Sequence, residues 1–174
     1  MAAAFSIEMA GSDGQNILDL DNIQEDDGSI SHSPSATAYY LLKINPENTK
    51  ALGYLQRTSN GKGGIPMAAP FEICERAWVL WNLRLVESLD GEILDLCKPH
   101  LDELQNAWKP NKGVGFTRDH SVFDGDDTSL TFDVLQQFGY SPDIETLLVF
   151  EEADHFRSYS LEINFSVSTN VHFL

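Results

Sequence analysis

Three aspartates crowd into one short stretch, Asp124-Gly125-Asp126-Asp127-Thr128, at an expected junction between a loop and a helix. Like charges this close together cannot all ionise freely, so we expect at least one of these carboxyl groups to have a raised pKa. A carboxyl group that keeps its proton near neutral pH can act as a general acid. The stretch is therefore the first candidate for a catalytic site.

Other interpretations of the aspartate stretch have to be weighed against acid catalysis. The plainest is a helix cap, because aspartate is favoured at the N-cap and in the first helical turn. A phosphatase nucleophile would follow a buried parallel strand, and residues 116–123 are too polar for one. A calcium loop needs alternating oxygen ligands and a distal glutamate, which do not line up here. A diphosphate–magnesium motif of the Asp-Asp-x-x-Asp kind would lack its third carboxylate, since Thr128, Ser129 and Leu130 follow.

The remaining chemical interpretation is a Brønsted acid that protonates an alkene or an epoxide. That reaction needs a strong acid in a dry, aromatic-lined cavity, where ring faces stabilise the carbocation. The sequence offers these aromatic residues for such a lining: Trp78, Trp81, Trp108, Phe116, Phe123, Phe132 and Tyr140.

Composition limits the possible partners and the location of the chain. Its 174 residues suffice for a real core, and 11 Lys and Arg against 27 Asp and Glu give a net charge of −16. Nucleic acid and anionic membranes are disfavoured, because both need basic surface. No stretch approaches the roughly 20 apolar residues of a membrane span. Two isolated cysteines and an N-terminus without the features of a secretory signal predict a cytoplasmic location.

Hydrophobic spacing predicts a mostly helical chain. The helices are expected over residues 36–42, 47–56, 71–89, 93–108, 126–138, 143–150 and 166–174. Residues 10–33 are loop-rich, with at most one short helix near 17–23, and residues 151–165 hold at most a short strand or hairpin. Gly91 is expected to break one helix, and Pro99 to kink or split the next. Successive helices of this kind predict an all-α fold, a partial α/α barrel or a solenoid.

Several ordered segments resemble the class II diterpene cyclases, the copalyl diphosphate synthase group. Residues 122–128 resemble the Asp-x-Asp-Asp-Thr motif of class II terpene cyclases, which squalene–hopene cyclases share. Residues 33–38 resemble the Ser-Pro-Ser-Ala-Thr-Ala signature of the diterpene enzymes. Further landmarks in the same order are Gly63-Gly64-Ile65-Pro66, Phe71-Glu72, Trp78 and residues 135–140. Residues 166–172 look closest to the fungal bifunctional members, which make copalyl diphosphate and kaurene.

The resemblance implies a reaction and a role for each acidic residue. The reaction is the protonation-initiated cyclisation of geranylgeranyl diphosphate to a copalyl-type diphosphate, carried out by an intramolecular lyase or isomerase. Asp126 matches the catalytic acid that protonates the terminal alkene, and Asp124 and Asp127 match its supporting carboxylates. His172 falls where plant relatives place an asparagine that hydrogen-bonds the acid and where hopene cyclases use a histidine.

The resemblance also implies Mg²⁺, which would accompany the diphosphate of the substrate. Glu25 and Asp26 are the candidate ligands, but a solvated turn before Gly28 explains these residues better. The chain departs from the plant enzymes in one respect. Their His–Asn pair, which positions the water that takes the final proton, corresponds here to Phe5 and Met67.

Full-length members of this group build the site between two helical domains, β and γ, and often add a class I α domain. We assign residues 1–110 to the later part of γ with its link to β, and residues 111–174 to the first part of β. A partial barrel leaves apolar helix faces exposed, so we expect the missing domains to be needed for catalysis. Two alternatives stay open: a triterpene or meroterpenoid cyclase of the same mechanism, and an inactive helical module that only binds a partner.

Overall fold

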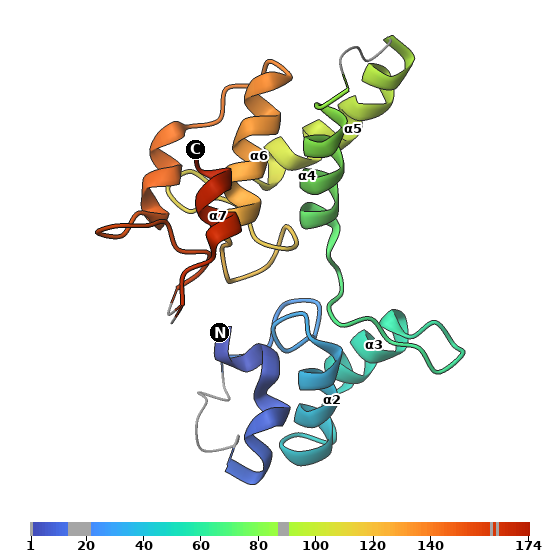
Figure 1. Ribbon diagram of the computed structural model, residues 1–174. Helices are drawn as coiled ribbons and strands as arrows, with labels where there is room; N and C mark the ends of the chain where they lie inside the picture. Colours follow the sequence, from blue (N-terminus) through green and yellow to red (C-terminus); the bar gives the residue numbers. More distant parts are fainter. Residues whose placement is uncertain (1, 14–21, 87–90, 161, 163) are drawn as a thin grey trace. The chain divides into compact units, whose positions relative to one another are not determined.

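The structure is a computed structural model that describes residues 2–13, 22–86, 91–160, 162 and 164–174. The chain divides into two compact units, which are treated separately (Figure 1). The N-terminal unit contains residues 1–70 together with the short loop 119–121, and the C-terminal unit contains residues 71–118 and 122–174. None of the helices in the described ranges is long and apolar enough to cross a membrane.

In the described part of the N-terminal unit, a 3-10 helix and two α-helices pack around a small core. These elements are η1 (Ala2–Asp13), α2 (Pro34–Lys43) and α3 (Thr49–Thr58). Helix α2 begins where the sequence predicts, because the Ala36 N–H donates to the Ser33 hydroxyl and Pro34 occupies the first turn. The buried core consists of Ala4, Ile7, Ile23, Ile30, Ala36, Tyr40 and Ala51.

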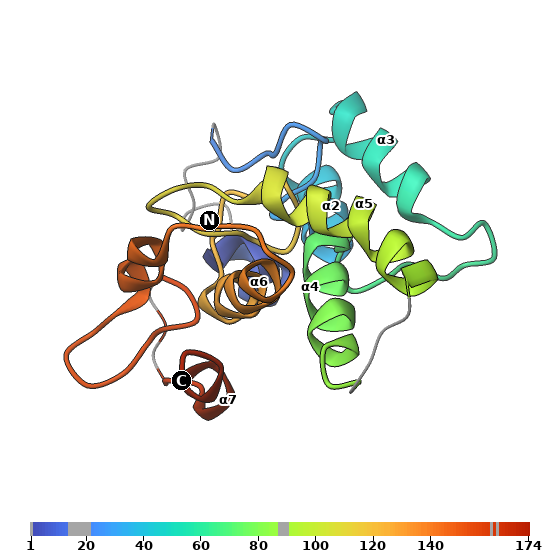
Figure 2. The ribbon, with the colours of Figure 1, turned by 90° about the horizontal axis from the view of Figure 1, so that it is seen from above.

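The described residues of the C-terminal unit form four α-helices and one 3-10 helix. These are α4 (Glu72–Leu83), α5 (Gly91–Ala107), α6 (Gly125–Gln137), η2 (Ile144–Phe150) and α7 (Val167–His172). Helix α6 packs against α4, α5 and α7, as Figures 1 and 2 show. Apolar side chains from three of the helices fill the core, among them Ile73, Leu80, Leu101, Leu104, Leu130, Val134 and Leu135.

The helical prediction is confirmed, and the described residues contain only isolated β-bridges, one of them at the expected hairpin between Glu151 and Phe156. Two boundaries were predicted wrongly. Helix α4 ends at Leu83 although the apolar pattern continues, because Leu85 and Val86 are exposed and find no core to cover. Gly91 begins α5 instead of breaking a helix.

Two further predictions concern the helices and the division of the chain. Pro99 lies inside α5 without ending it, and buried side chains on both sides of the proline hold the helix against α4 and α6. The short helix expected near residues 17–23 falls mostly on residues 14–21, outside the described ranges, and η1 was not predicted. The assignment of residues 1–110 and 111–174 to parts of γ and β domains stays a prediction.

Candidate active site

The aspartate stretch forms the N-terminus of α6, which two loops anchor. The Asp124 carboxylate accepts the N–H of Asp127 at 3.0 Å, so the helix-cap interpretation is correct for this residue. On one side, the Val114 N–H donates to the Thr128 hydroxyl at 3.0 Å. On the other side, the Gly125 N–H donates to the Ser158 carbonyl at 2.5 Å. These contacts fix the direction in which the three carboxylates leave the helix.

Burial raises the pKa of Asp124 and of Asp127. Asp124 is 8% exposed, and burial together with the charges of Asp127 and Asp126 raises its pKa to about 8. Asp127 is 2% exposed; burial raises its pKa to about 6, although hydrogen bonds from Cys74 and Trp78 oppose the shift. The expected raised pKa is therefore present, but desolvation contributes more to it than the like charges that the sequence suggested.

Asp126 contacts the last residue of α7. Its side chain is 22% exposed, and its Oδ1 is hydrogen-bonded to Nδ1 of His172. The hydroxyl of Ser166 caps α7 by accepting the N–H of Thr169 at 3.3 Å, so this short helix has a defined start. Asp126 is thus the most exposed of the three carboxyl groups, and a side chain of α7 holds it.

Two tryptophans of α4 complete the surroundings of the acid. The His172 ring packs edge to face against both tryptophan rings. The distance between ring centroids is 5.4 Å for Trp78 and 5.3 Å for Trp81. Trp78 also donates its Nε1–H to the Asp127 carboxylate at 3.2 Å. One helix therefore presents two aromatic rings to the histidine and a hydrogen-bond donor to a supporting carboxylate.

The other aromatic residues that the sequence offered lie elsewhere in the C-terminal unit. Trp108 and Phe132 pack together in the core, with ring centroids 6.2 Å apart. The ring of Phe116 packs on Phe71, and the Tyr140 hydroxyl donates to Asp102. Lys109 and Lys112 lie over the ring of Phe123. Of the seven candidates that the sequence offered, the structure thus brings Trp78 and Trp81 to the histidine that contacts the acid.

Cys74 belongs to the same cluster, and the sequence interpretation missed it. Its thiol hydrogen-bonds Asp127, and burial together with the nearby carboxylates raises the pKa of the thiol. Cys74 and Trp78 stand four residues apart on α4, a spacing that places both side chains on one helix face. That spacing indicates that Cys74 shares a helix face with Trp78, but it does not show that the thiol meets Asp127. The thiol stays protonated and acts as a hydrogen-bond donor.

The candidate Mg²⁺ ligands lie in the N-terminal unit and differ in their surroundings. Glu25 is 8% exposed and accepts a hydrogen bond from the Ser121 hydroxyl at 2.8 Å, whereas Asp26 is exposed. His32 and His120 bring imidazole nitrogens near the Glu25 carboxylate. Mg²⁺ prefers an octahedral shell of oxygen ligands, so this donor set fits it poorly.

The raised pKa of Asp124 predicts that the protein loses stability as the pH rises. The unfolded carboxyl group titrates near its ordinary pKa of 3.8, whereas the folded one keeps its proton up to about pH 8. Between these values the folded state binds more protons, so the stabilisation is complete at low pH and is lost as the pH rises through about 8. Asp124→Asn keeps an N-cap but cannot titrate.

We therefore expect the free energy of unfolding to fall less between pH 5 and pH 8 in Asp124→Asn than in the unmodified chain. The decrease in the free energy of unfolding between the two pH values should differ between the proteins by on the order of 3 kcal/mol. Urea denaturation of both proteins at the two pH values measures it. Parallel pH profiles for the two proteins would show that Asp124 is already ionised at pH 5.

The relatives found by sequence comparison include diterpene cyclases. No protein-family model matches the chain. The chain is 45% identical over 177 residues to a type B diterpene cyclase of Mycobacterium tuberculosis, covering 100% of the chain and 35% of that relative. It is 36% identical to the copal-8-ol diphosphate hydratase of Cistus creticus, covering 85% of the chain and 18% of that relative.

Solved structures give the same result. One match is the ent-copalyl diphosphate synthase of Arabidopsis thaliana, solved in complex with (S)-15-aza-14,15-dihydrogeranylgeranyl thiolodiphosphate. The match has a TM-score of 0.83 at 26% identity and covers 99% of the chain and 24% of the synthase. The ent-copalyl diphosphate synthase of Streptomyces platensis matches 84% of the chain with a TM-score of 0.70 at 28% identity, over 27% of its own length.

These relatives are bacterial and plant proteins, so the similarity to fungal bifunctional enzymes stays a prediction. The chain spans about a third or less of the length of the curated relatives it matches. In sequence and in fold, it corresponds to a segment of the class II diterpene cyclases of the copalyl diphosphate synthase group.

Proposed function

We propose that this chain carries the proton-donating part of a class II diterpene cyclase, with Asp126 as the acid. The observation that carries the proposal is the contact between Asp126 and His172 beside Trp78 and Trp81. The substrate would be geranylgeranyl diphosphate and the product a copalyl-type diphosphate, as the similarity to diterpene cyclases supports.

The division of labour among the three carboxyl groups follows from their burial. A hydrocarbon substrate can only meet an acid that reaches accessible space, and Asp126 is the most exposed of the three. Asp124 and Asp127 are buried and hydrogen-bonded, so they act on the reaction by holding the start of α6 in place. With Nδ1–H of His172 donating to Oδ1 of Asp126, the transferable proton sits on the other oxygen, Oδ2.

The proposed first step transfers that proton to the terminal carbon–carbon double bond of the substrate. The electron pair of the double bond forms the new C–H bond, which leaves a tertiary carbocation and an Asp126 carboxylate. The next double bonds close two rings, and loss of a proton elsewhere ends the reaction with the diphosphate intact. One proton enters and one leaves, so the net change is an isomerisation. A tryptophan face beside the cation contributes about 0.5–2 kcal/mol.

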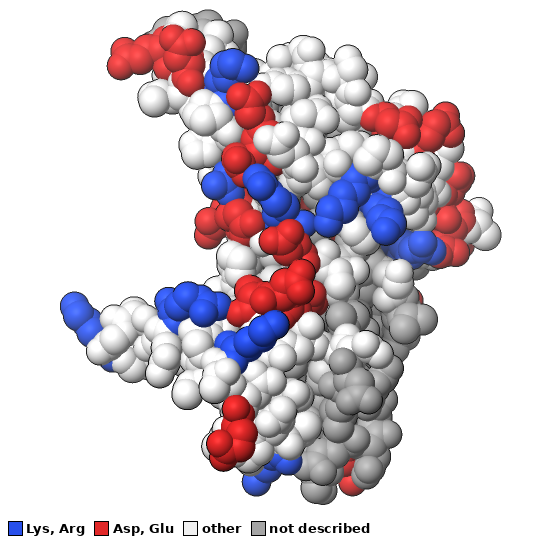
Figure 3. Space-filling view, turned by 180° about the vertical axis from the view of Figure 1, so that it is seen from behind, with Lys and Arg blue, Asp and Glu red and all other residues white. Residues whose placement is uncertain are grey.

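Other parts of the proposed site are assigned to the segments of the relatives that lie outside the matched region. On the face shown in Figure 3, acidic side chains lie among the Lys and Arg residues. Among the described residues, several cations are paired with carboxylates: Arg118 with Glu103, Arg157 with Glu152 and Arg84 with Asp133. The groups that hold the diphosphate, and any Mg²⁺ that accompanies it, are therefore proposed to come from segments that correspond to the unmatched parts of the relatives.

A chimera tests the proposed function. This chain would replace the matching segment of the Mycobacterium tuberculosis relative, which supplies the rest of the polypeptide. Incubation with geranylgeranyl diphosphate should give a bicyclic copalyl-type diphosphate, identified by mass spectrometry after dephosphorylation. A folded chimera that leaves geranylgeranyl diphosphate unchanged, while the unmodified relative converts its own substrate, would refute the proposal and favour the binding module.

Replacing His172 in the same chimera should slow turnover without stopping it. Phenylalanine fills the space between the two tryptophans but cannot hydrogen-bond Asp126, so we expect kcat to fall about 10–100-fold. Asparagine keeps a donor and should retain more activity than phenylalanine. Steady-state kinetics of His172→Phe and His172→Asn measure the difference. Equal kcat values for the two variants would mean that the hydrogen bond to the acid does not matter.

A further inference from the structure

The N-terminal unit contains a buried cluster of metal-ligating side chains that the proposed cyclisation does not use. Glu25, His32 and His120 each offer one ligand atom, and these atoms all lie within 4.8 Å of one another. The three residues are 8%, 2% and 4% exposed. Four ligands at about 2.0–2.1 Å around a tetrahedral zinc ion stand roughly 3.3 Å apart, so small side-chain movements would close the three atoms around an ion.

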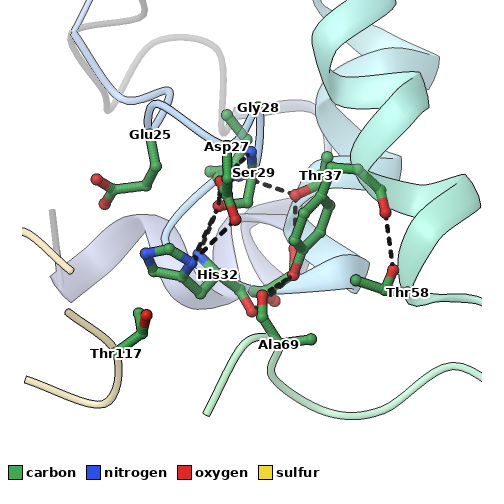
Figure 4. A network of polar contacts seen from close by, with 12 residues as sticks. Glu25, Asp27, Gly28, Ser29, His32, Thr37, Thr58, Ala69 and Thr117 are labelled. Atoms are coloured by element: carbon green, nitrogen blue, oxygen red, sulfur yellow. Dashed lines mark hydrogen bonds and ion pairs between the residues drawn. The ribbon is translucent and has the colours of Figure 1, made fainter. Parts of the chain in front are cut away.

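The two nitrogens of His32 have different surroundings. Nδ1 lies 3.3 Å from the Asp27 carboxylate and 3.5 Å from the Ser29 hydroxyl, whereas Nε2 is buried without a hydrogen-bond partner. Figure 4 shows Asp27 and Ser29 against one side of the ring, and the far nitrogen pointing away from them. A carboxylate on one ring nitrogen fixes the proton there and leaves a lone pair on the other, as metal-bound histidines require.

The backbone around His32 is strained and held on both sides. Ser31 and His32 both have positive φ, 52° and 55°, a conformation that non-glycine residues seldom adopt. Asp27 is itself fixed, because it accepts the N–H of Ser29 at 2.9 Å. The His32 carbonyl accepts the N–H of Ala69 at 3.0 Å. Strain of this kind persists where the surrounding structure enforces it, and it gathers at functional sites.

Glu25 is oriented by a residue next to His120. Its Oε1 accepts the Ser121 hydroxyl at 2.8 Å, which leaves Oε2 for a metal ion. The rings of His32 and His120 meet edge to face at 4.9 Å between centroids. Two imidazoles and one carboxylate are donors of intermediate softness. Such a set suits Zn²⁺ and related transition metals, whereas Mg²⁺ prefers oxygen ligands alone.

We propose that Glu25, His32 and His120 bind a divalent transition metal ion of the zinc class, with Asp27 orienting His32. The site has three protein ligands, so a water molecule would complete a tetrahedral shell. The inference goes beyond the cyclisation, because none of these residues takes part in the proton transfer from Asp126. An ion held here would bind the loop at residues 119–121 to the turn at residues 25–32.

The test measures binding of Zn²⁺ and Co²⁺ to the purified, untagged 174-residue chain. Calorimetry with ZnCl₂ should give one equivalent of tightly bound metal that excess Mg²⁺ does not displace. His120→Gln should abolish this binding, while the matched variant His100→Gln, on α5, should bind as the unmodified chain does. Asp27→Asn keeps all three ligands and should weaken binding about 10–100-fold. Circular dichroism checks that each variant is folded.

The absorption spectrum of bound Co²⁺ distinguishes the proposed ligands from the two cysteines of the chain. Co²⁺ at this site should give visible d–d bands of tetrahedral intensity without a thiolate charge-transfer band, and the bands should disappear in His120→Gln. Absence of tight binding would overturn the proposal. So would a thiolate band, or equal binding by folded His120→Gln and the unmodified chain. Cyclisation by the chimera is measured separately, so failure of one proposal leaves the other intact.

Discussion

Asp126→Asn should remove product formation from the chimera with geranylgeranyl diphosphate, lowering kcat by roughly 10²–10⁴-fold. Asparagine has nearly the same shape as aspartate, but it has no acidic proton to give to the alkene. The buried partners Asp124 and Asp127 cannot replace the acid, because one caps α6 and the other is held by Trp78. Quantification of the diterpene product by gas chromatography measures the loss.

The matched control is Asp133→Asn, a change of the same kind on the same helix. Asp133 is 39% exposed and pairs with Arg84 at 3.1 Å, so its replacement loses only a surface ion pair. We expect the control to keep full activity. Unchanged turnover in Asp126→Asn would refute the assignment of the acid. Equal losses in both variants would point to general damage to α6.

Gly125→Ala should destabilise the C-terminal unit by about 3 kcal/mol. A Cβ atom at this position would lie 2.4 Å from the backbone carbonyl oxygen of Arg157 and 3.0 Å from the ring of Phe150. A backbone oxygen cannot move aside as a flexible side chain can, so the start of α6 or the loop before α7 has to shift. The same shift would pull Asp126 away from His172, so activity should fall with stability.

Gly91→Ala is the control for the glycine change. A Cβ atom at Gly91 meets no atom within 4 Å, and alanine is a better helix former than glycine. Urea denaturation should therefore show little change or a small gain for Gly91→Ala and a clear loss for Gly125→Ala. Equal stabilities of the two variants would mean that the close approach between α6 and residue 157 is not maintained in solution.

The helices could be predicted from the sequence because their signals are local. Ser33 and Pro34 mark the start of α2, and Asp124 marks the start of α6. The end of α4 could not be predicted in this way, because whether Leu85 and Val86 are covered depends on residues far along the chain. The 3-10 helix η1 has no strong periodicity, so it forms through tertiary packing.

The candidate site was predicted in part. The resemblance pointed to Asp126 and His172, which stand 46 residues apart, and the structure brings them into contact. Their catalytic roles stay predictions. The importance of burial for Asp124 and the approach of Cys74 to Asp127 could not be read from the sequence, because both depend on how α4 packs against α6. His32 and His120, 88 positions apart by their numbering, show no sequence spacing typical of a metal site.

Incorporation of deuterium from D₂O is the most direct test of an acid-initiated reaction. The carboxyl proton of Asp126 exchanges with solvent, so each cyclisation in D₂O should place one deuterium on the carbon of the former terminal alkene. Mass spectrometry should then show the product one mass unit heavier, with the label at that carbon by NMR. A cyclised product without deuterium would contradict the account, because it would mean that the reaction begins by another route, such as loss of the diphosphate.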